Sequence, residues 1–124
     1  MKRKVLVVED DATVRDVLTT LLGFEDFEVR TASDGATGLA LADSMKPDIV
    51  LLDVGLPELD GLEVCRMLRK RSPNTRVVML TGRSTAEDEL HGVAAGADVY
   101  LRKPFSPLAL LEAMGVGRDG RVLR

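Results

Sequence analysis

The chain has 124 residues, of which 45% are hydrophobic and 30% charged, with a net charge of −3. This length and composition predict one folded domain with a buried core and exclude a disordered chain. No apolar run approaches the roughly 18 residues of a membrane span, and no signal peptide is recognisable, so we expect a cytoplasmic location and no membrane partner. The negative charge argues against direct binding of nucleic acid by this domain. Cys65 is the only cysteine, which excludes an internal disulfide.

Five short segments predict strands. Residues 5–8, 49–52 and 77–80 are apolar throughout, as expected for parallel strands that are covered on both faces. Residues 28–32 and 99–102 mix polar and apolar side chains, which is typical of strands at the edges of a sheet.

Helices are predicted between these strands. The first is indicated by aliphatic residues with the spacing of one buried helical face: Val14, Val17, Leu18, Leu21 and Leu22. Asp34 is expected to cap a second helix that carries Leu39 and Ala40. A third helix is expected over about 62–71, because Pro73 disfavours its continuation.

The last two helices have different signals. The fourth, near residues 85–95, has only a weak apolar face made by Leu90, Val93 and Ala94. The fifth is expected to begin after Ser106 and to continue through Met114, because a serine followed by proline is a typical helix start.

The order strand–helix, repeated five times, predicts an α/β fold of the doubly wound kind. We expect a (βα)5 three-layer sandwich with a parallel five-stranded sheet in the flavodoxin-like order 2-1-3-4-5. The folded domain is expected to cover residues 1–114. The Gly- and Arg-rich segment 115–124 is interpreted as a flexible tail or as the start of a linker to an output domain.

Polar side chains follow the predicted strands where ligands bind in such sheets. These residues are Glu9, Asp10 and Asp11, then Asp53, Thr81 and Lys103. Carboxylates that lie close together repel one another unless a cation joins them, and oxygen ligands of this kind suit Mg²⁺. A metal, a lysine and a hydroxyl around one aspartate could orient a phosphoryl group, and the aspartate could be the nucleophile that accepts it.

Each residue alone also has a simpler interpretation. The acids after the first strand could cap a helix, Thr81 could be an ordinary strand residue, and Lys103 and Tyr100 could lie on the surface. The convergence of all of them at one edge favours a site. Cys65 is best interpreted as a small core residue, and His91 as a solvated residue on the fourth helix.

Several motifs in the same order resemble the receiver domains of two-component signalling, over about residues 4–114. They are Val7-Val8-Glu9-Asp10-Asp11, Leu52-Asp53-Val54-Gly55-Leu56-Pro57, Asp60-Gly61, Leu80-Thr81-Gly82 and Lys103-Pro104-Phe105. The resemblance implies a response regulator that receives a phosphoryl group from a histidine kinase or a phosphotransfer protein. It further implies that the domain catalyses only its own phosphorylation and dephosphorylation.

The resemblance also assigns roles by position. Asp53 would be the phosphoacceptor and Lys103 the cation that pairs with the phosphoryl group. Mg²⁺, with Mn²⁺ as a substitute, would be held by Asp10, Asp53 and the main-chain carbonyl of Gly55, with Glu9 acting through water.

Further positions would transmit or modulate the signal. Thr81 would be the switch hydroxyl, and Tyr100 the aromatic whose rotamer follows it. Gly82 and Arg83 would modulate access to the phosphoryl group and its lifetime. The bond between Lys103 and Pro104 is expected to be cis.

This sequence also departs from the family's pattern. Gly55 stands where a side chain is usual, Gly82 replaces the usual alanine, and Asp26 lies where a glycine in a left-handed conformation is common. The output face, made in this family by the fourth helix, fifth strand and fifth helix, would present Leu90, Val99 and Leu108. It is therefore interpreted as an apolar surface for a homodimer or an effector. The tail resembles linkers to helix-turn-helix domains, which suggests transcription regulation.

Three other functions remain open at this point. An aspartate-nucleophile phosphohydrolase would carry a second acid where Gly55 stands. A flavin-binding domain would need a phosphate-binding loop after the first strand, where the acids from Glu9 onward would repel phosphate. A degenerate receiver that serves only as a binding module would be expected to have lost an acid, Thr81 or Lys103.

Overall fold

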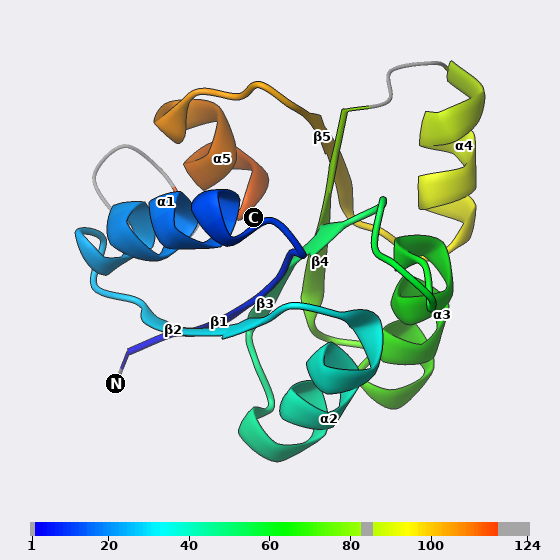
Figure 1. Ribbon diagram of the computed structural model, residues 1–124, viewed down its shortest axis with the longest axis horizontal. Coiled ribbons are helices and arrows are strands. Elements are labelled where there is room, and N and C mark those ends of the chain that lie inside the picture. Colours follow the sequence, from blue (N-terminus) through cyan, green and yellow to red (C-terminus); the bar gives the residue numbers. More distant parts are fainter. Residues whose placement is uncertain (1, 83–85, 117–124) are drawn as a thin grey trace.

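The computed structural model describes residues 2–82 and 86–116. Its strands form one parallel sheet in the order β2-β1-β3-β4-β5 (Figure 1). The strands are β1 (Lys4–Val8), β2 (Glu28–Ala32), β3 (Ile49–Asp53), β4 (Arg76–Thr81) and β5 (Val99–Arg102). This confirms the predicted sheet and places both strands of mixed polarity at its edges.

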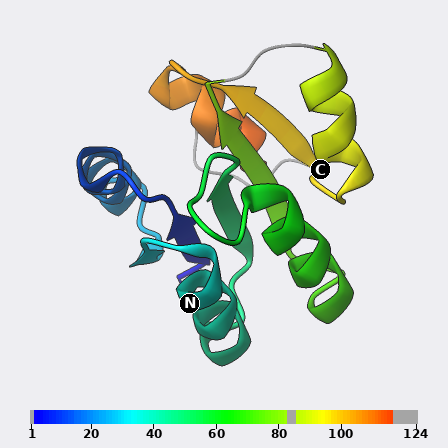
Figure 2. The ribbon, with the colours of Figure 1, turned by 45° about the vertical axis from the view of Figure 1, so that its right-hand side comes forward.

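The helices cover the two faces of the sheet (Figure 2). They are α1 (Ala12–Gly23), α2 (Gly35–Met45), α3 (Gly61–Arg71), α4 (Ala86–Ala94) and α5 (Pro107–Ala113). Helices α1 and α5 lie on one face, and α2, α3 and α4 lie on the other (Figures 1 and 2). The predicted three-layer sandwich is therefore confirmed.

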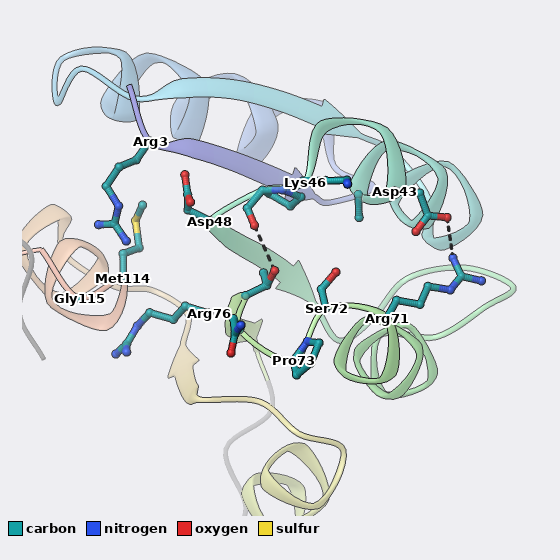
Figure 3. Close-up of a pocket in the computed structure, with 14 residues that line it drawn as sticks. Arg3, Asp43, Lys46, Asp48, Arg71, Ser72, Pro73, Arg76, Met114 and Gly115 are labelled. Carbon is teal, nitrogen blue, oxygen red and sulfur yellow. Dashed lines mark hydrogen bonds and ion pairs between the residues drawn. The ribbon is translucent and has the colours of Figure 1, made fainter. Parts of the chain in front are cut away.

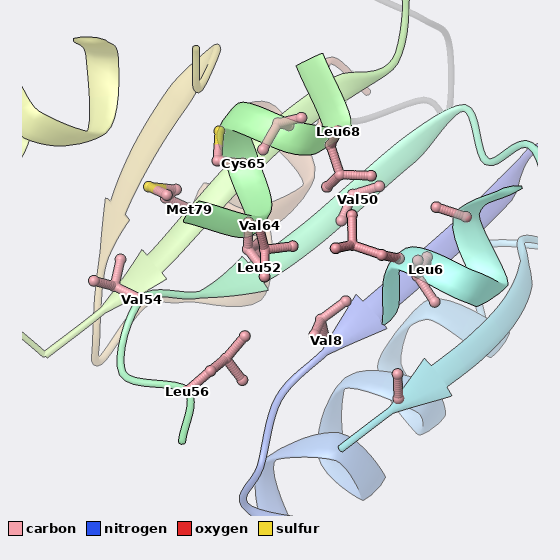
Figure 4. Packing of buried hydrophobic residues seen from close by; sticks show 14 of the residues in the cluster. Leu6, Val8, Val50, Leu52, Val54, Leu56, Val64, Cys65, Leu68 and Met79 are labelled. Carbon is pink, nitrogen blue, oxygen red and sulfur yellow. The ribbon is translucent and has the colours of Figure 1, made fainter. Parts of the chain in front are cut away.

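Alternation along the central strands divides the core into two clusters. Leu6, Val8, Val50 and Leu52 face α2 and α3 (Figure 4), and the intervening residues face α1 and α5. The predicted core residue Cys65 is buried in the first cluster. Burial of each such aliphatic side chain contributes roughly 1.5–3 kcal/mol. The rigid strands that result fix the positions of the polar residues that follow them.

The predicted helix starts are present. A carboxylate oxygen of Asp34 accepts a hydrogen bond from the backbone N–H of Thr37 at 2.8 Å. Ser106 Oγ accepts one from the N–H of Ala109 at 3.0 Å, and Pro107 is the first residue of α5. These caps satisfy backbone donors that a helix leaves unpaired.

Two predicted helical faces differ from those observed. Val17 is 59% exposed, because α1 contacts the sheet through Leu18 and Leu22, and Val17 lies on the flank of that stripe. In α4, Leu90 and Val93 are 67% and 62% exposed, so they do not form its packing face. The buried residue of α4 is Gly92. Because glycine has no side chain, the helix can pack closely here without an apolar side chain at the contact. Thr85, the expected start of this helix, lies outside the described residues.

The backbone has the expected special conformations. Asp26 has a left-handed φ of 62°, and the bond between Lys103 and Pro104 is cis.

Within the expected tail, Gly115 and Val116 are buried, while residues 117–124 lie outside the described part of the chain. Among the helices that the structure describes, none is long and apolar enough to span a membrane.

Candidate functional site

Three acidic side chains meet where β1 and β3 end. Oxygen atoms of Glu9, Asp10 and Asp53 all lie within 4.8 Å of one another. Glu9 and Asp53 are 1% and 7% exposed, whereas Asp10 is open to solvent. The cluster is thus a partly buried group of carboxylates with one side accessible.

The sheet register brings these acids together. Val8 is paired with Leu52, so the residues that follow β1 and those that end β3 are neighbours. Beyond β3, the N–H of Gly61 donates to the carbonyl of Val54 at 3.1 Å, which closes the loop before α3. A Cβ on Gly61 would overlap the carbonyl oxygen of Asp53 and would lie 2.7 Å from Cα of Val54. Glycine is therefore required here for the loop to pack against Asp53.

Lys103 reaches the acids from the loop after β5. Its Nζ lies 2.8 Å from Oε1 of Glu9 and 3.6 Å from Oδ1 of Asp53. Its backbone N–H donates to the carbonyl of Thr81 at 2.7 Å, and the cis bond to Pro104 follows. The structure thus brings Lys103 and Asp53 close together at the edge of the sheet where the sequence predicted a site.

The charges of the site influence one another. Burial raises the pKa of Glu9 and the nearby Asp53 carboxylate raises it further, although the hydrogen bond from Lys103 opposes this change. Burial would lower the pKa of Lys103, but its hydrogen bond to Glu9 and the charge of Asp53 outweigh burial and raise it. Lys103 is therefore firmly protonated, and this one ammonium group serves a cluster of three carboxyl groups.

Asp11 has the helix-capping role that the simpler interpretation assigned to the acidic segment. One of its carboxylate oxygens, Oδ1, accepts hydrogen bonds from the N–H groups of Thr13 at 2.8 Å and Val14 at 3.3 Å. The two acids before it remain available to the site.

The guanidinium of Arg15 donates to the carbonyl of Glu9 at 2.8 Å. This contact could not be predicted from the sequence, because a side chain that reaches back to a backbone carbonyl leaves no periodic signal.

Thr81 and two glycines border Asp53. Thr81 ends β4 and is 2% exposed. The N–H of Gly55 donates to Oδ1 of Asp53 at 3.2 Å, and a Cβ there would lie 3.9 Å from the same oxygen. A Cβ on the exposed Gly82 would have no atom within 4 Å. Gly55 therefore leaves the approach to Asp53 open, and Gly82 follows two residues after Leu80, which pairs with Asp53. Arg83 lies outside the described residues.

Tyr100 lies farther along the sheet, below α4. A Cβ on Gly92 would be 2.7 Å from Cδ1 of the Tyr100 ring, so the ring lies directly against the helix backbone. Its hydroxyl is buried and has no hydrogen-bond partner among the described residues. The expected solvated residue of the same helix, His91, is exposed.

Two cavities differ in their relation to the acids. One of about 640 Å³ adjoins the site and is lined by residues that include Gly82, Tyr100 and Lys103. The other, of about 810 Å³, is lined by the loops that precede β3 and β4 and contains none of the candidate residues (Figure 3). The ion pair between Arg71 and Asp43, at 3.0 Å, lies at its rim.

The acidic cluster fits a divalent cation. Three carboxylates offer only oxygen ligands, and the accessible side of the cluster leaves room for water, which is the environment that Mg²⁺ prefers. Burial is the main cause of the raised pKa of Glu9, and such a cation would also offset the repulsion from Asp53 that adds to it.

A family model of the response regulator receiver domain matches residues 5–115. Response regulator MprA of Mycolicibacterium vanbaalenii is 45% identical over 114 residues, which cover 92% of this chain and 49% of that protein. The alkaline phosphatase synthesis transcriptional regulatory protein PhoP of Bacillus subtilis is 43% identical over 107 residues, which cover 86% and 45%. The chain thus spans about half the length of these curated relatives.

Solved structures agree with these matches. The chemotaxis protein CheY4 of Vibrio cholerae has a TM-score of 0.87 and 34% identity, covering 92% of this chain and 97% of that one. The BeF3-activated receiver domain of DrrB, from Thermotoga maritima, has a TM-score of 0.83 and 38% identity, covering 90% and 93%.

Proposed function

Since the chain belongs to the receiver domains of two-component response regulators, we propose that Asp53 is the residue that accepts its phosphoryl group. The observation that carries this proposal is the close approach of Asp53 to both an acidic pair and a lysine. Oxygens of Glu9 and Asp10 lie within 4.8 Å of an oxygen of Asp53, and Nζ of Lys103 lies 3.6 Å from Oδ1 of Asp53. Among the three acids, Asp53 alone ends a central strand, and it lies beside Gly55, which presents no side chain to it.

In the proposed reaction, a carboxylate oxygen of Asp53 attacks the phosphorus atom of a phosphohistidine on a histidine kinase or a phosphotransfer protein. A bond between that oxygen and phosphorus forms, the phosphorus–nitrogen bond breaks, and the imidazole nitrogen leaves with the electron pair. The protein catalyses this transfer and the later hydrolysis for itself alone, so it is no enzyme for an external substrate.

The residues around Asp53 have distinct tasks in this proposal. Asp10, Asp53 and the carbonyl of Gly55 would hold Mg²⁺ or Mn²⁺, with Glu9 acting through water. The bound cation would supply positive charge that lets the anionic phosphoryl group approach the carboxylates. Lys103 would shift its contact from Glu9 toward a phosphoryl oxygen on Asp53, since its Nζ already lies 3.6 Å from Oδ1 of Asp53.

The switch residues connect this chemistry to the output face. Thr81 is proposed to turn its hydroxyl toward the phosphoryl group, and Tyr100 to follow by changing its rotamer beneath α4. Gly82 and Arg83 are proposed to modulate how long the phosphorylated state lasts.

The output surface is proposed to lie on α4, β5 and α5. Leu90 and Val93 are exposed there, while Val99 and Leu108 are half-buried. The apolar surface is thus centred on α4 rather than spread evenly over the three elements. We expect it to bind a second copy or an effector, with an association that high salt does not dissolve.

The chain's place in a longer protein is also a proposal. The matched relatives are about twice as long as the matched region, and the Bacillus subtilis relative is named a transcriptional regulatory protein. We therefore propose that residues 1–114 are the receiver, that 115–124 begin a linker to an output domain, and that the protein regulates transcription in the cytoplasm.

The proposed function is tested by incubating the protein with phosphoramidate and following its intact mass. With Mg²⁺, one phosphoryl group should be added per chain. With EDTA, the mass should remain unchanged. An unchanged mass in both conditions would contradict a receiver that phosphorylates itself and would favour a degenerate binding module.

A further inference from the structure

Among the described residues, the Arg15 side chain makes one hydrogen bond, and that bond is with the backbone of the site. It lies in the first turns of α1, and its Nη1 donates to the carbonyl oxygen of Glu9 at 2.8 Å. Among the described residues, the Arg15 side chain has no other hydrogen bond or ion pair. The carbonyl belongs to the peptide group that joins Glu9 to Asp10, so Arg15 fixes the plane from which both acids project.

The two acids depend on this peptide to different degrees. The Glu9 side chain is held by Lys103 at 2.8 Å and by the N–H of Asp11 at 3.3 Å. The Asp10 side chain is exposed and, within the described ranges, has no hydrogen bond or ion pair of its own. Its position near Asp53 therefore depends on the backbone. The Glu9 side chain restrains this backbone at the N–H of Asp11, and Arg15 restrains it at the carbonyl of Glu9.

We infer that Arg15 is a positioning residue that orients the Glu9–Asp10 peptide so that Asp10 can bind a divalent cation. This inference rests on the proposed function, since it concerns the same metal site. It deepens that function by naming a residue of α1 that touches neither the cation nor the phosphoryl group.

The sign of the effect separates positioning from simple electrostatics. Arg15 is a positive charge close to a cation site, so its removal should strengthen cation binding if only charge matters. If Arg15 positions Asp10, its removal should weaken binding, because the exposed carboxylate loses its fixed direction. Outer partners of metal ligands typically contribute about 10- to 100-fold in affinity.

The test is calorimetric titration of the folded protein with Mg²⁺ alone. The variant Arg15→Met keeps an aliphatic stem but removes the charge and the hydrogen-bond donor. We expect its Kd for Mg²⁺ to rise about tenfold. Arg15→Lys keeps the charge and a shorter donor, and its affinity should lie between those of the wild type and Arg15→Met. Lys70→Met removes a positive charge from an exposed position in the last turn of α3 and should leave the Kd unchanged.

Each outcome decides the matter. Equal or tighter binding by Arg15→Met, with normal binding by the wild type, overturns the inference but not the proposed function. A wild type that does not bind Mg²⁺ overturns both. If Arg15→Met does not fold, Arg15→Lys decides, since weaker binding than wild type supports positioning and equal binding contradicts it.

Discussion

The ammonium group of Lys103 is hydrogen-bonded to the buried carboxylate of Glu9, at 2.8 Å from its Oε1. Its distance to Oδ1 of Asp53 is longer, 3.6 Å. One lysine is therefore shared by carboxylates that also repel one another. The stability of the protein should consequently depend on the protonation of Glu9 and on added metal.

The first prediction concerns the pH dependence of stability without metal. The pKa of Glu9 is raised in the folded state, so the folded protein favours its protonated form. Its contribution to stability is fully present below the unfolded pKa, and it is lost as the pH rises through the higher folded value. Glu9→Gln, which resembles the protonated acid, should become progressively more stable than the wild type as the pH rises from about 4.3 toward neutral.

This difference is measured by urea denaturation in EDTA at several pH values. Added Mg²⁺ at neutral pH should stabilise the wild type more than Glu9→Gln, because the variant has one carboxylate fewer. A stability difference that does not change with pH would show that the raised pKa of Glu9 has no effect on folding.

The second prediction separates the roles of two adjacent acids. Asp10→Ala should weaken Mg²⁺ binding at least tenfold without lowering stability in EDTA, because it removes a ligand and a repelling charge. Asp11→Ala should leave Mg²⁺ binding nearly unchanged but should cost about 1 kcal/mol of stability, because Asp11 caps α1. Calorimetry and urea denaturation measure the two effects. The reverse pattern would mean that the acidic pair is assigned one position too early.

The third prediction concerns the packing of Tyr100 against α4. A Cβ at Gly92 would lie 2.7 Å and 2.9 Å from ring atoms of Tyr100, and 3.2 Å from the sulfur of Met79. Gly92→Ala should therefore displace the ring and cost about 1–3 kcal/mol. Tyr100 is the only tyrosine, and the chain has no tryptophan. Intrinsic fluorescence thus reports this ring alone, and its quenching by acrylamide should increase in the variant.

The matched control for this substitution is Gly23→Ala, at the end of α1. A Cβ there has no atom within 4 Å. Because alanine favours a helix more than glycine does, this variant should be as stable as the wild type or up to about 1 kcal/mol more stable. Its quenching should not change. Unchanged quenching in Gly92→Ala would mean that α4 moves away instead of the ring.

The sequence predicted the sheet order and the members of the site because both follow from strong local signals. The apolar run over residues 49–52 identifies a central strand, and its end places Asp53 at the carboxyl edge. Lys103 could be assigned because it follows the last strand. The roles of all these residues nevertheless rest on the resemblance to receiver domains, and their chemistry stays a prediction.

Other features depend on packing that no local pattern encodes. Val17 has the right spacing for the buried face of α1, yet it lies on the flank of the stripe made by Leu18 and Leu22 and is exposed. The Tyr100 ring of β5 packs against α4 at Gly92, where there is no side chain to leave a signal in the sequence. The hydrogen bond from Arg15 to Glu9 joins a side chain to a carbonyl six residues earlier. A periodic sequence pattern predicts neither the exposure of Val17 nor these two contacts.

The measurement that tests the central claim most directly locates the phosphoryl group. After reaction with phosphoramidate and Mg²⁺, borohydride reduces an aspartyl phosphate to homoserine, which peptide mass spectrometry can assign to one position. We predict homoserine at position 53 and at no other acid, and no mass increase in Asp53→Asn. Homoserine at position 10 or 11, or undiminished phosphorylation of Asp53→Asn, would contradict the account.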